Sequence, residues 1–161
     1  MSVLSHNVIA GASIADDASG DGYQIEKSLR FNEADSPSLE RTTSLGNRRI
    51  WTWSGWVKRS DVATSGHAYL FGSWEDGNNA SRCMWATADQ KLQFYQKIGG
   101  TVAADFKTNA VYRDPGAWMH VVVAYDSPNA TESERLKIYV NGEIQVLTQT
   151  TAIPQNQESW I

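Results

Sequence analysis

The residues of this chain that could do chemistry are few and scattered. Hydrolysis of a glycosidic bond needs two carboxyl groups that flank the bond, one as acid and one as nucleophile or base. Glu132 and Glu134 come nearest to such a pair, but they share a face only if their polar stretch is extended. We predict a solvated loop there and no catalytic pair.

Nucleophilic catalysis finds no better support in the sequence. His120 lies within an apolar run, where a histidine of the core or of the sheet face is expected. Cys83 has the surroundings of a small buried hydrophobic residue. The sequence has neither a phosphate-binding loop nor the ligand spacing of a zinc site. We therefore predict that the protein is not an enzyme and has no catalytic residues.

Binding of carbohydrate is a second chemistry that the side chains could support. It needs an exposed aromatic ring against the apolar face of a sugar, with polar side chains for the hydroxyl groups. The candidate residues are Trp56, Trp74, Asn78, Asn79, Trp85 and Tyr95. For each aromatic residue the competing interpretation is packing in the core or in an interface, since most large aromatic side chains are buried.

The composition is that of a folded protein of one domain. The 161 residues are 41% hydrophobic and 20% charged, enough to bury a core. The formal net charge of −4, without a basic patch, argues against binding of nucleic acid. No apolar run approaches ~18 residues, so insertion into a membrane is not expected.

Residues 1–26 differ in composition from the rest and are predicted to form an arm or linker. They are rich in Ser, Ala, Gly and Asp, and their short apolar patch is Val8, Ile9 and Ala10. Two interpretations are open: a disordered terminus, or an arm that becomes ordered against a larger assembly through this patch. The globular domain is predicted over residues 27–161.

The stretch from Trp51 to Lys58 is the strongest strand signal. With a strand period of two, Trp51, Trp53 and Val57 point to one face, which predicts a central strand covered by its neighbours. Trp56 falls on the opposite face, which is otherwise polar. Trp56 is therefore the first candidate for a recognition residue.

Other strand-like stretches follow, separated by turn signals at intervals of about 8–12 residues, as in a β-sandwich. We expect strands over residues 28–32, 38–42, 68–74, 82–86, 91–97, 101–111, 118–125 and 136–146, the last as a hairpin. No stretch has a convincing helical period. The fold is predicted to be all-β with minimal helix.

The hairpin around Asn141 and Gly142 allows two registers. A two-residue turn pairs Tyr139 with Ile144, whereas a three-residue loop with a bulge at Gly142 pairs Ile138 with Ile144. The second register gathers the apolar residues on one face, so we predict it.

Four stretches, taken in order, carry a family signal. They are Ser28–Phe31, Trp51–Lys58, Trp118–Asp126 and Leu136–Gly142, and together they span roughly residues 28–147. In order and spacing they resemble the laminin-G/concanavalin-A-like jelly-roll family, in particular the form carried by virion proteins of tailed phages. The resemblance implies an antiparallel jelly-roll β-sandwich whose closing strands lie beyond Ile161, in a longer chain or from a neighbouring one.

The resemblance also implies a function. The leading hypothesis is a non-enzymatic structural module of the phage virion, a fibre or decoration component that is anchored by its N-terminal arm to capsid or tail. It would assemble in the host cytoplasm with copies of itself and with other virion proteins. The alternative is a carbohydrate-binding module for host-surface polysaccharide. A glycoside hydrolase is least favoured, because the Glu-x-Asp-x-Glu run of the family's glucanases is missing.

Calcium is the one cofactor that the resemblance suggests, since lectins of this kind often hold the ion with oxygen ligands from loops. Asp35, Asp76 and Asp126 fall in predicted loops and are the candidate ligands. The sequence contains no local cage such as an EF-hand loop, so no metal site is firmly predicted.

Overall fold

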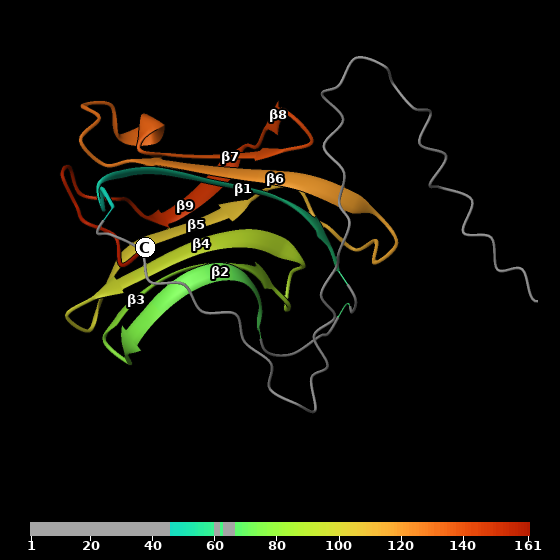
Figure 1. Cartoon of the computed structure of the whole chain (residues 1–161), viewed down its shortest axis with the longest axis horizontal. Helices are drawn as coiled ribbons and strands as arrows, with labels where there is room; N and C mark the ends of the chain where they lie inside the picture. Colours follow the sequence, from blue (N-terminus) through green and yellow to red (C-terminus); the bar gives the residue numbers. More distant parts are fainter. Residues whose placement is uncertain (1–45, 60–61, 63–66) are drawn as a thin grey trace, which may run out of the picture. The chain divides into compact units, whose positions relative to one another are not determined.

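The computed structural model describes residues 46–59, 62 and 67–161 (Figure 1). The chain divides into two units, Met1–Thr43 and Ser44–Ile161, and every described residue belongs to the second. Several sequence predictions lie outside the described residues: the arm with Val8, Ile9 and Ala10, the strands at 28–32 and 38–42, and Asp35 as a calcium ligand.

The described part is built almost entirely of strands. In chain order its elements are β1 (Ile50–Lys58), β2 (His67–Asp76), β3 (Asn79–Ala86), β4 (Lys91–Ile98), β5 (Thr101–Thr108), β6 (Trp118–Asp126), the 3₁₀ turn η2 (Glu132–Glu134), β7 (Leu136–Val140), β8 (Glu143–Ile144) and β9 (Leu147–Thr151). Sheet A has the order β1-β6-β7-β8 and sheet B the order β2-β3-β4-β5-β9, with antiparallel pairing. The predicted all-β antiparallel sandwich is confirmed. None of the described residues forms a helix with the length and hydropathy needed to cross a membrane.

Sheet A is built around β6. The inward side chains of β6, from Met119 to Tyr125, are buried, and the strand pairs with β1 on one side and β7 on the other. Among the described residues β1 pairs with β6 alone, so a central position of the tryptophan strand stays a prediction. The predicted inward face of this strand is confirmed, since Trp51 is half-buried and stacks on Tyr125 with ring centroids 5.2 Å apart.

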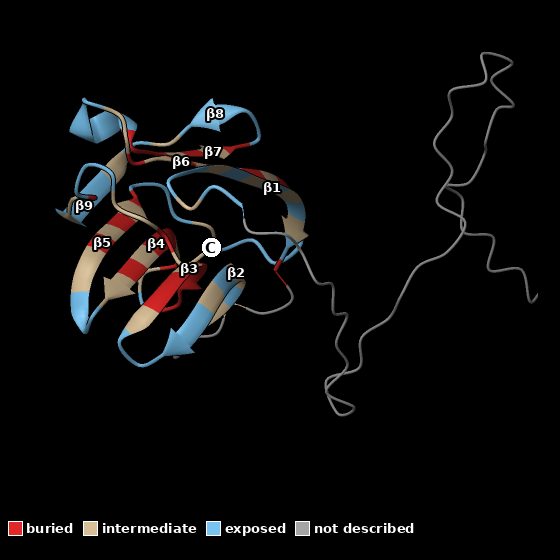
Figure 2. Ribbon diagram, turned by 60° about the vertical axis from the view of Figure 1, so that its left-hand side comes forward, coloured by how far each residue is buried: buried red, intermediate tan, exposed pale blue. Residues whose placement is uncertain are grey.

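Sheet B supplies the other half of the core. Cys83 and Trp85 of β3 and Phe94 of β4 point inward and are buried, whereas Arg82 and Tyr95 alternate with them and point outward. Figure 2 shows burial concentrated in the middle of this sheet and low along its edge strand β2. In Figure 1, β2 and β4 arch towards sheet A, so the outer face of sheet B is concave.

The C-terminal segment, residues 153–161, ties the two sheets together. Trp51 Nε1 of sheet A donates a hydrogen bond to Ser159 Oγ at 2.8 Å. Gln96 Nε2 of sheet B donates to the carbonyl oxygen of Glu158 at 2.7 Å. These bonds join sheet A to sheet B through the C-terminal segment.

The β7–β8 hairpin contradicts the predicted bulged register. Tyr139 pairs with Ile144 across the two-residue turn Asn141-Gly142. Both turn residues have positive φ, 52° and 86°, as a type I′ turn requires. The predicted register relied on burial of Ile144. In the structure Ile144 is 58% exposed, so its burial does not decide which residues pair.

Candidate functional site

The outer face of sheet B gathers four side chains beside its edge strand β2. They are Tyr69, Trp74, Arg82 and Tyr95, and we call them the Arg82 cage. The strand register produces this cluster, since Gly72 of β2 pairs with Arg82 of β3, which pairs in turn with Tyr95 of β4. Residues in register on neighbouring strands share a face of the sheet.

A β-bulge in β2 turns Tyr69 and Trp74 to the same face. Strict alternation from Tyr69 would place Phe71 outward and Trp74 inward, but the register shifts between Tyr69 and Phe71. Leu70 and Phe71 therefore both pack against the core, and Phe71 stacks on Trp53 of sheet A with ring centroids 4.5 Å apart. Bulges that re-aim side chains in this way are common beside functional sites.

The Arg82 guanidinium is surrounded by rings and has no acidic partner among the described residues. Its Cζ lies 4.8 Å from the ring centroid of Tyr95, 5.5 Å from Trp74 and 5.8 Å from Tyr69. Nη1 donates a long hydrogen bond of 3.4 Å to Tyr69 Oη, and Nε is buried with no hydrogen-bond partner. None of the ion pairs between described residues includes Arg82. The cation–π contacts, worth ~0.5–1 kcal/mol each at exposed sites, hold the group in place without neutralising it.

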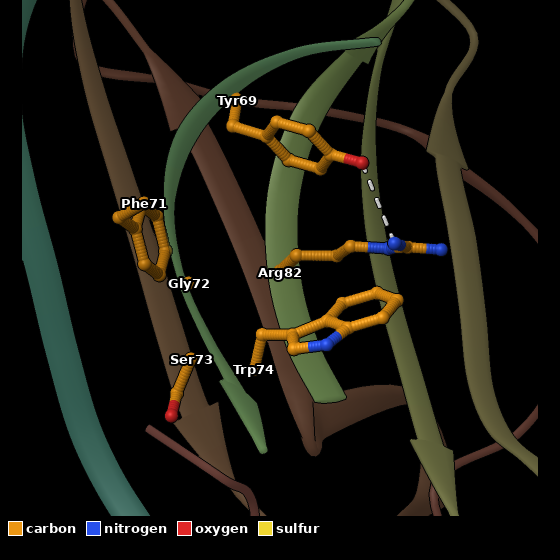
Figure 3. A pocket seen from close by; sticks show the side chains of 6 residues that line it. All are labelled: Tyr69, Phe71, Gly72, Ser73, Trp74 and Arg82. Atoms are coloured by element: carbon orange, nitrogen blue, oxygen red, sulfur yellow. Dashed lines mark hydrogen bonds between the residues drawn. The ribbon is translucent and has the colours of Figure 1, made fainter. Parts of the chain in front are cut away.

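A hollow of about 270 Å³ opens between Tyr69 and Trp74 (Figure 3). Gly72 leaves this space open, because a Cβ at that position would lie 2.8 Å from the Ser81 carbonyl oxygen and 3.0 Å from Arg82 Cβ. Figure 3 shows the Arg82 side chain passing between the phenol ring and the indole. The hollow is slightly smaller than the ~300–1,000 Å³ of typical ligand pockets, and its size suits a single small ring.

Of the residues predicted for a carbohydrate site, the structure brings Trp74 and Tyr95 together in the cage. Asn78 and Asn79 lie at the β2–β3 turn, just past the end of β2 that carries Trp74. Asn79 Oδ1 already accepts a hydrogen bond from the backbone N–H of Gly99 at 2.9 Å. Its first role is therefore to join two neighbouring turns at this end of the sheet.

Trp56 and Trp85 lie away from the cage. Trp56 is on the outer face of sheet A, 67% exposed, and its ring centroid is 5.2 Å from that of His120, which confirms the prediction of a histidine on the sheet face. Trp85 is only 4% exposed, because the alternation that points Arg82 outward points Trp85 into the core. A buried indole offers no platform to a sugar, so Trp85 is removed from the candidate residues.

Three residues of the site were not predicted from the sequence: Tyr69, Gly72 and Arg82. The alternation of Arg82 with Cys83 gave a usable signal, because it predicts an outward guanidinium in a hairpin rich in aromatic residues. Gly72 could not be matched to Arg82 by counting back from the turn, since the register of β2 shifts at two places.

The side chains considered for catalysis make other interactions or are buried. Glu132 and Glu134 lie in η2, where Glu134 forms an ion pair with Lys137 and Glu132 Oε1 accepts a hydrogen bond from Gln149 Nε2 at 3.0 Å. The hydrogen bond and charge of Glu134 raise the pKa of Lys137. Burial raises the pKa of Cys83 to about 12, so its thiol stays protonated at neutral pH, consistent with a buried hydrophobic residue.

The described residues hold no cluster of three His, Cys, Asp or Glu side chains that could bind a metal. Asp76 Oδ1 accepts a hydrogen bond from Asn78 N at 2.7 Å, and Asp126 Oδ2 accepts one from Asn129 Nδ2 at 3.3 Å. The two aspartates end strands of different sheets. Calcium binding stays a prediction from the resemblance.

Comparison with known proteins agrees with the two-sheet architecture. The family model Laminin_G_3, described as the Concanavalin A-like lectin/glucanases superfamily, matches residues 31–160. The chain belongs to this superfamily. No curated protein and no solved structure matched it. A concanavalin A-like domain is compatible with sugar binding, with a structural role or with catalysis, so the choice among them has to come from the site.

Proposed function

We propose that this concanavalin A-like domain is a non-catalytic carbohydrate-binding module and that the Arg82 cage is its binding site. The observation that carries the proposal is an exposed indole, Trp74, beside a hollow of about 270 Å³ on the concave face of sheet B. Sugars present apolar C–H faces to aromatic rings and hydroxyl groups to polar side chains, and the cage supplies both. The carboxylates of Glu132 and Glu134, which lie between β6 and β7 of sheet A, are not part of the site.

Isothermal titration with a broad panel of bacterial surface polysaccharides and oligosaccharides tests this proposal. Trp74→Ala removes the stacking surface, so we expect the affinity to fall ~10-fold or more, which corresponds to ~1.4 kcal/mol. Trp56→Ala is the matched control, an equally exposed indole on the other sheet, and should leave the affinity unchanged.

If instead Trp56→Ala alone lost affinity for the saccharide, the binding site would lie on sheet A. Silence across the panel for the unmodified protein, with the domain shown to be folded by circular dichroism, would contradict carbohydrate binding altogether.

We propose a structural module of a tailed-phage virion as a second candidate function, and a different face supports it. The outer side of sheet A and its β7–β8 end expose large apolar side chains: Trp56 at 67%, Trp118 at 61%, Ile144 at 58% and, just beyond β8, Val146 at 70%. Exposed apolar side chains that gather on one face are typical of protein contacts. In this proposal residues 1–26 attach the module to capsid or tail, and the sheet A face contacts copies of the chain or other virion proteins. The two functions are compatible in a fibre that also binds host polysaccharide.

Deletion of residues 1–22 tests the structural candidate. Incorporation into particles should be lost, while circular dichroism should show that the domain stays folded, because the globular domain is predicted to begin at residue 27. Particles that carry the truncated protein at the usual copy number would contradict attachment through the arm.

A further inference from the structure

This inference rests on the proposed function and concerns the chemical class of the sugar. Arg82 carries a positive charge that no acidic side chain among the described residues neutralises, although the chain as a whole has a net charge of −4. A guanidinium has five N–H donors in a planar fork, and within the described part of the chain only Nη1 makes a hydrogen bond, a long one of 3.4 Å. Nε is buried and has no hydrogen-bond partner among the described residues, so a ligand would pair with the Nη groups.

The neighbouring charged groups on sheet B do not supply the missing anion. Asp105 of β5 pairs in register with Tyr95 of the cage, and its carboxylate accepts a hydrogen bond from Gln93 Nε2 at 2.6 Å rather than from Arg82. Asp89 is paired with Lys107 at 2.8 Å. Lys97 of β4 adds a further cation, with its Nζ donating to a turn carbonyl oxygen. Glu75 and Asp76 follow Trp74 on β2, but neither forms an ion pair with Arg82, so among the described residues the Arg82 guanidinium is an unpaired cation.

We infer that the Arg82 cage binds an acidic saccharide whose ring carries a carboxylate, as in the uronic acids. The sugar ring lies against the exposed indole of Trp74, and its carboxylate meets the Nη groups at the far end of the Arg82 side chain (Figure 3). The guanidinium fork matches a carboxylate in a bidentate, charge-assisted pair that neither a hydroxyl group nor an ester reproduces. A neutral sugar makes the stacking contact but leaves the guanidinium unpaired, and this difference gives the selectivity.

Methyl esterification of the ligand is the sharpest test, because it removes the charge and leaves the sugar rings unchanged. The intact chain would be titrated with oligomers of galacturonate, mannuronate and glucuronate and with the methyl ester of each. We expect at least one acid to bind ~10-fold or more tightly than its ester, the size of one charge-assisted hydrogen bond. This comparison needs no variant, so it holds even if a substitution at Arg82 unfolds the domain.

Variants then assign the difference to Arg82. Arg82→Gln should bring the affinity for the acid down to that for the ester and leave the ester unaffected. Arg82→Lys keeps the charge without the fork, so an intermediate affinity is expected. Lys107→Gln removes a cation from the same face of sheet B and serves as the matched control, with a change of no more than ~2-fold, because an exposed paired charge contributes little.

Each outcome separates the inference from the proposed function. Equal affinities for acid and ester overturn the inference, while binding of neutral sugars that depends on Trp74 keeps the proposed function. Dextran sulfate or oligoglutamate binding as tightly as the uronates also overturns it, because the site would then recognise any anion. If no saccharide of either kind binds, both fall together.

Discussion

The outer faces of the two sheets both expose a tryptophan, but only sheet B adds a fixed charge and a hollow. Trp74, 61% exposed, stands beside Arg82 and beside the space that Gly72 leaves open. Trp56, 67% exposed, stands beside His120 on an unbroken strand pair. Exposure of an indole is thus shared by the two faces, and what distinguishes them is the geometry around it.

That geometry comes from the strands. The β1–β6 ladder runs without interruption from Ile50 paired with Asp126 to Lys58 paired with Trp118. An unbroken ladder sets side chains next to one another at regular spacing and leaves no gap between them. The β2–β3 ladder shifts its register twice, and the first shift places Tyr69, Gly72 and Trp74 on one face. Irregular pairing therefore makes the site, and regular pairing makes a flat surface.

The inner faces, in contrast, are alike, and alkaline unfolding tests this with the largest expected effect. Burial raises the pKa of Cys83 under sheet B and of Tyr125 under sheet A to about 12 each. The unfolded chain loses these protons first, near pH ~8.5 for Cys and ~10 for Tyr. The contribution of both groups to the free energy of unfolding is therefore at its maximum below pH ~8.5 and falls progressively as the pH rises to about 12. Urea unfolding from pH 7 to 11 should show a midpoint that falls steadily in the upper half of this range.

Two variants separate the contributions of the inner faces. Cys83→Ala should remove the part of the slope that begins near pH ~8.5, and Tyr125→Phe the part that begins near pH ~10, while the phenyl ring still stacks on Trp51. A midpoint independent of pH in the unmodified protein would mean that the two groups are less enclosed than the structure has them.

Gly72→Ala tests the hollow on which the difference between the outer faces depends. The added Cβ would approach the Ser81 carbonyl oxygen to 2.8 Å, so the backbone must shift. We expect a loss of ~1–3 kcal/mol in the free energy of unfolding, as for overpacking in a core, together with loss of saccharide binding. Ser54→Ala, an exposed position on β1 of sheet A, should change stability by less than ~0.5 kcal/mol. A Gly72→Ala protein that binds saccharide normally would show that the hollow is not where the ligand sits.

The sequence predicted the fold and two of the four cage residues, Trp74 and Tyr95. The other two were not predicted, for a physical reason. Strand alternation and turn residues are local, so the all-β sandwich, buried Cys83 and the sheet-face position of His120 could be derived from short windows. Register is not local. The bulge after Tyr69 follows from how Leu70 and Phe71 both fit the core, and the β7–β8 turn follows from how little of β8 is buried. The error for Trp85 has another cause, since Trp85 lies two residues after Cys83 on the same strand and the predicted burial of Cys83 already places its indole on the inner face.

Trp56→Ala has the smallest expected effect on stability. It tests whether the outer face of sheet A is exposed in solution or covered by another copy of the chain. Within the described part of the chain the Trp56 ring contacts that of His120, and aromatic pairs of this kind contribute ~0.5–1.5 kcal/mol. For a free face we expect the free energy of unfolding to fall by no more than ~1 kcal/mol, independent of protein concentration, with no change in sedimentation. Trp74→Ala should cost about the same, since it loses one cation–π contact, so stability would not distinguish the two indoles and ligand affinity would.

A different result for Trp56 would change the comparison between the faces. If copies of the chain meet on sheet A, the unmodified protein gains stability with concentration by mass action, and Trp56→Ala lowers both that dependence and the sedimenting mass. Trp56 would then be an interface residue, and sheet A rather than sheet B would carry the assembly function. Both sheets would still be needed in a fibre that assembles with one face and binds polysaccharide with the other.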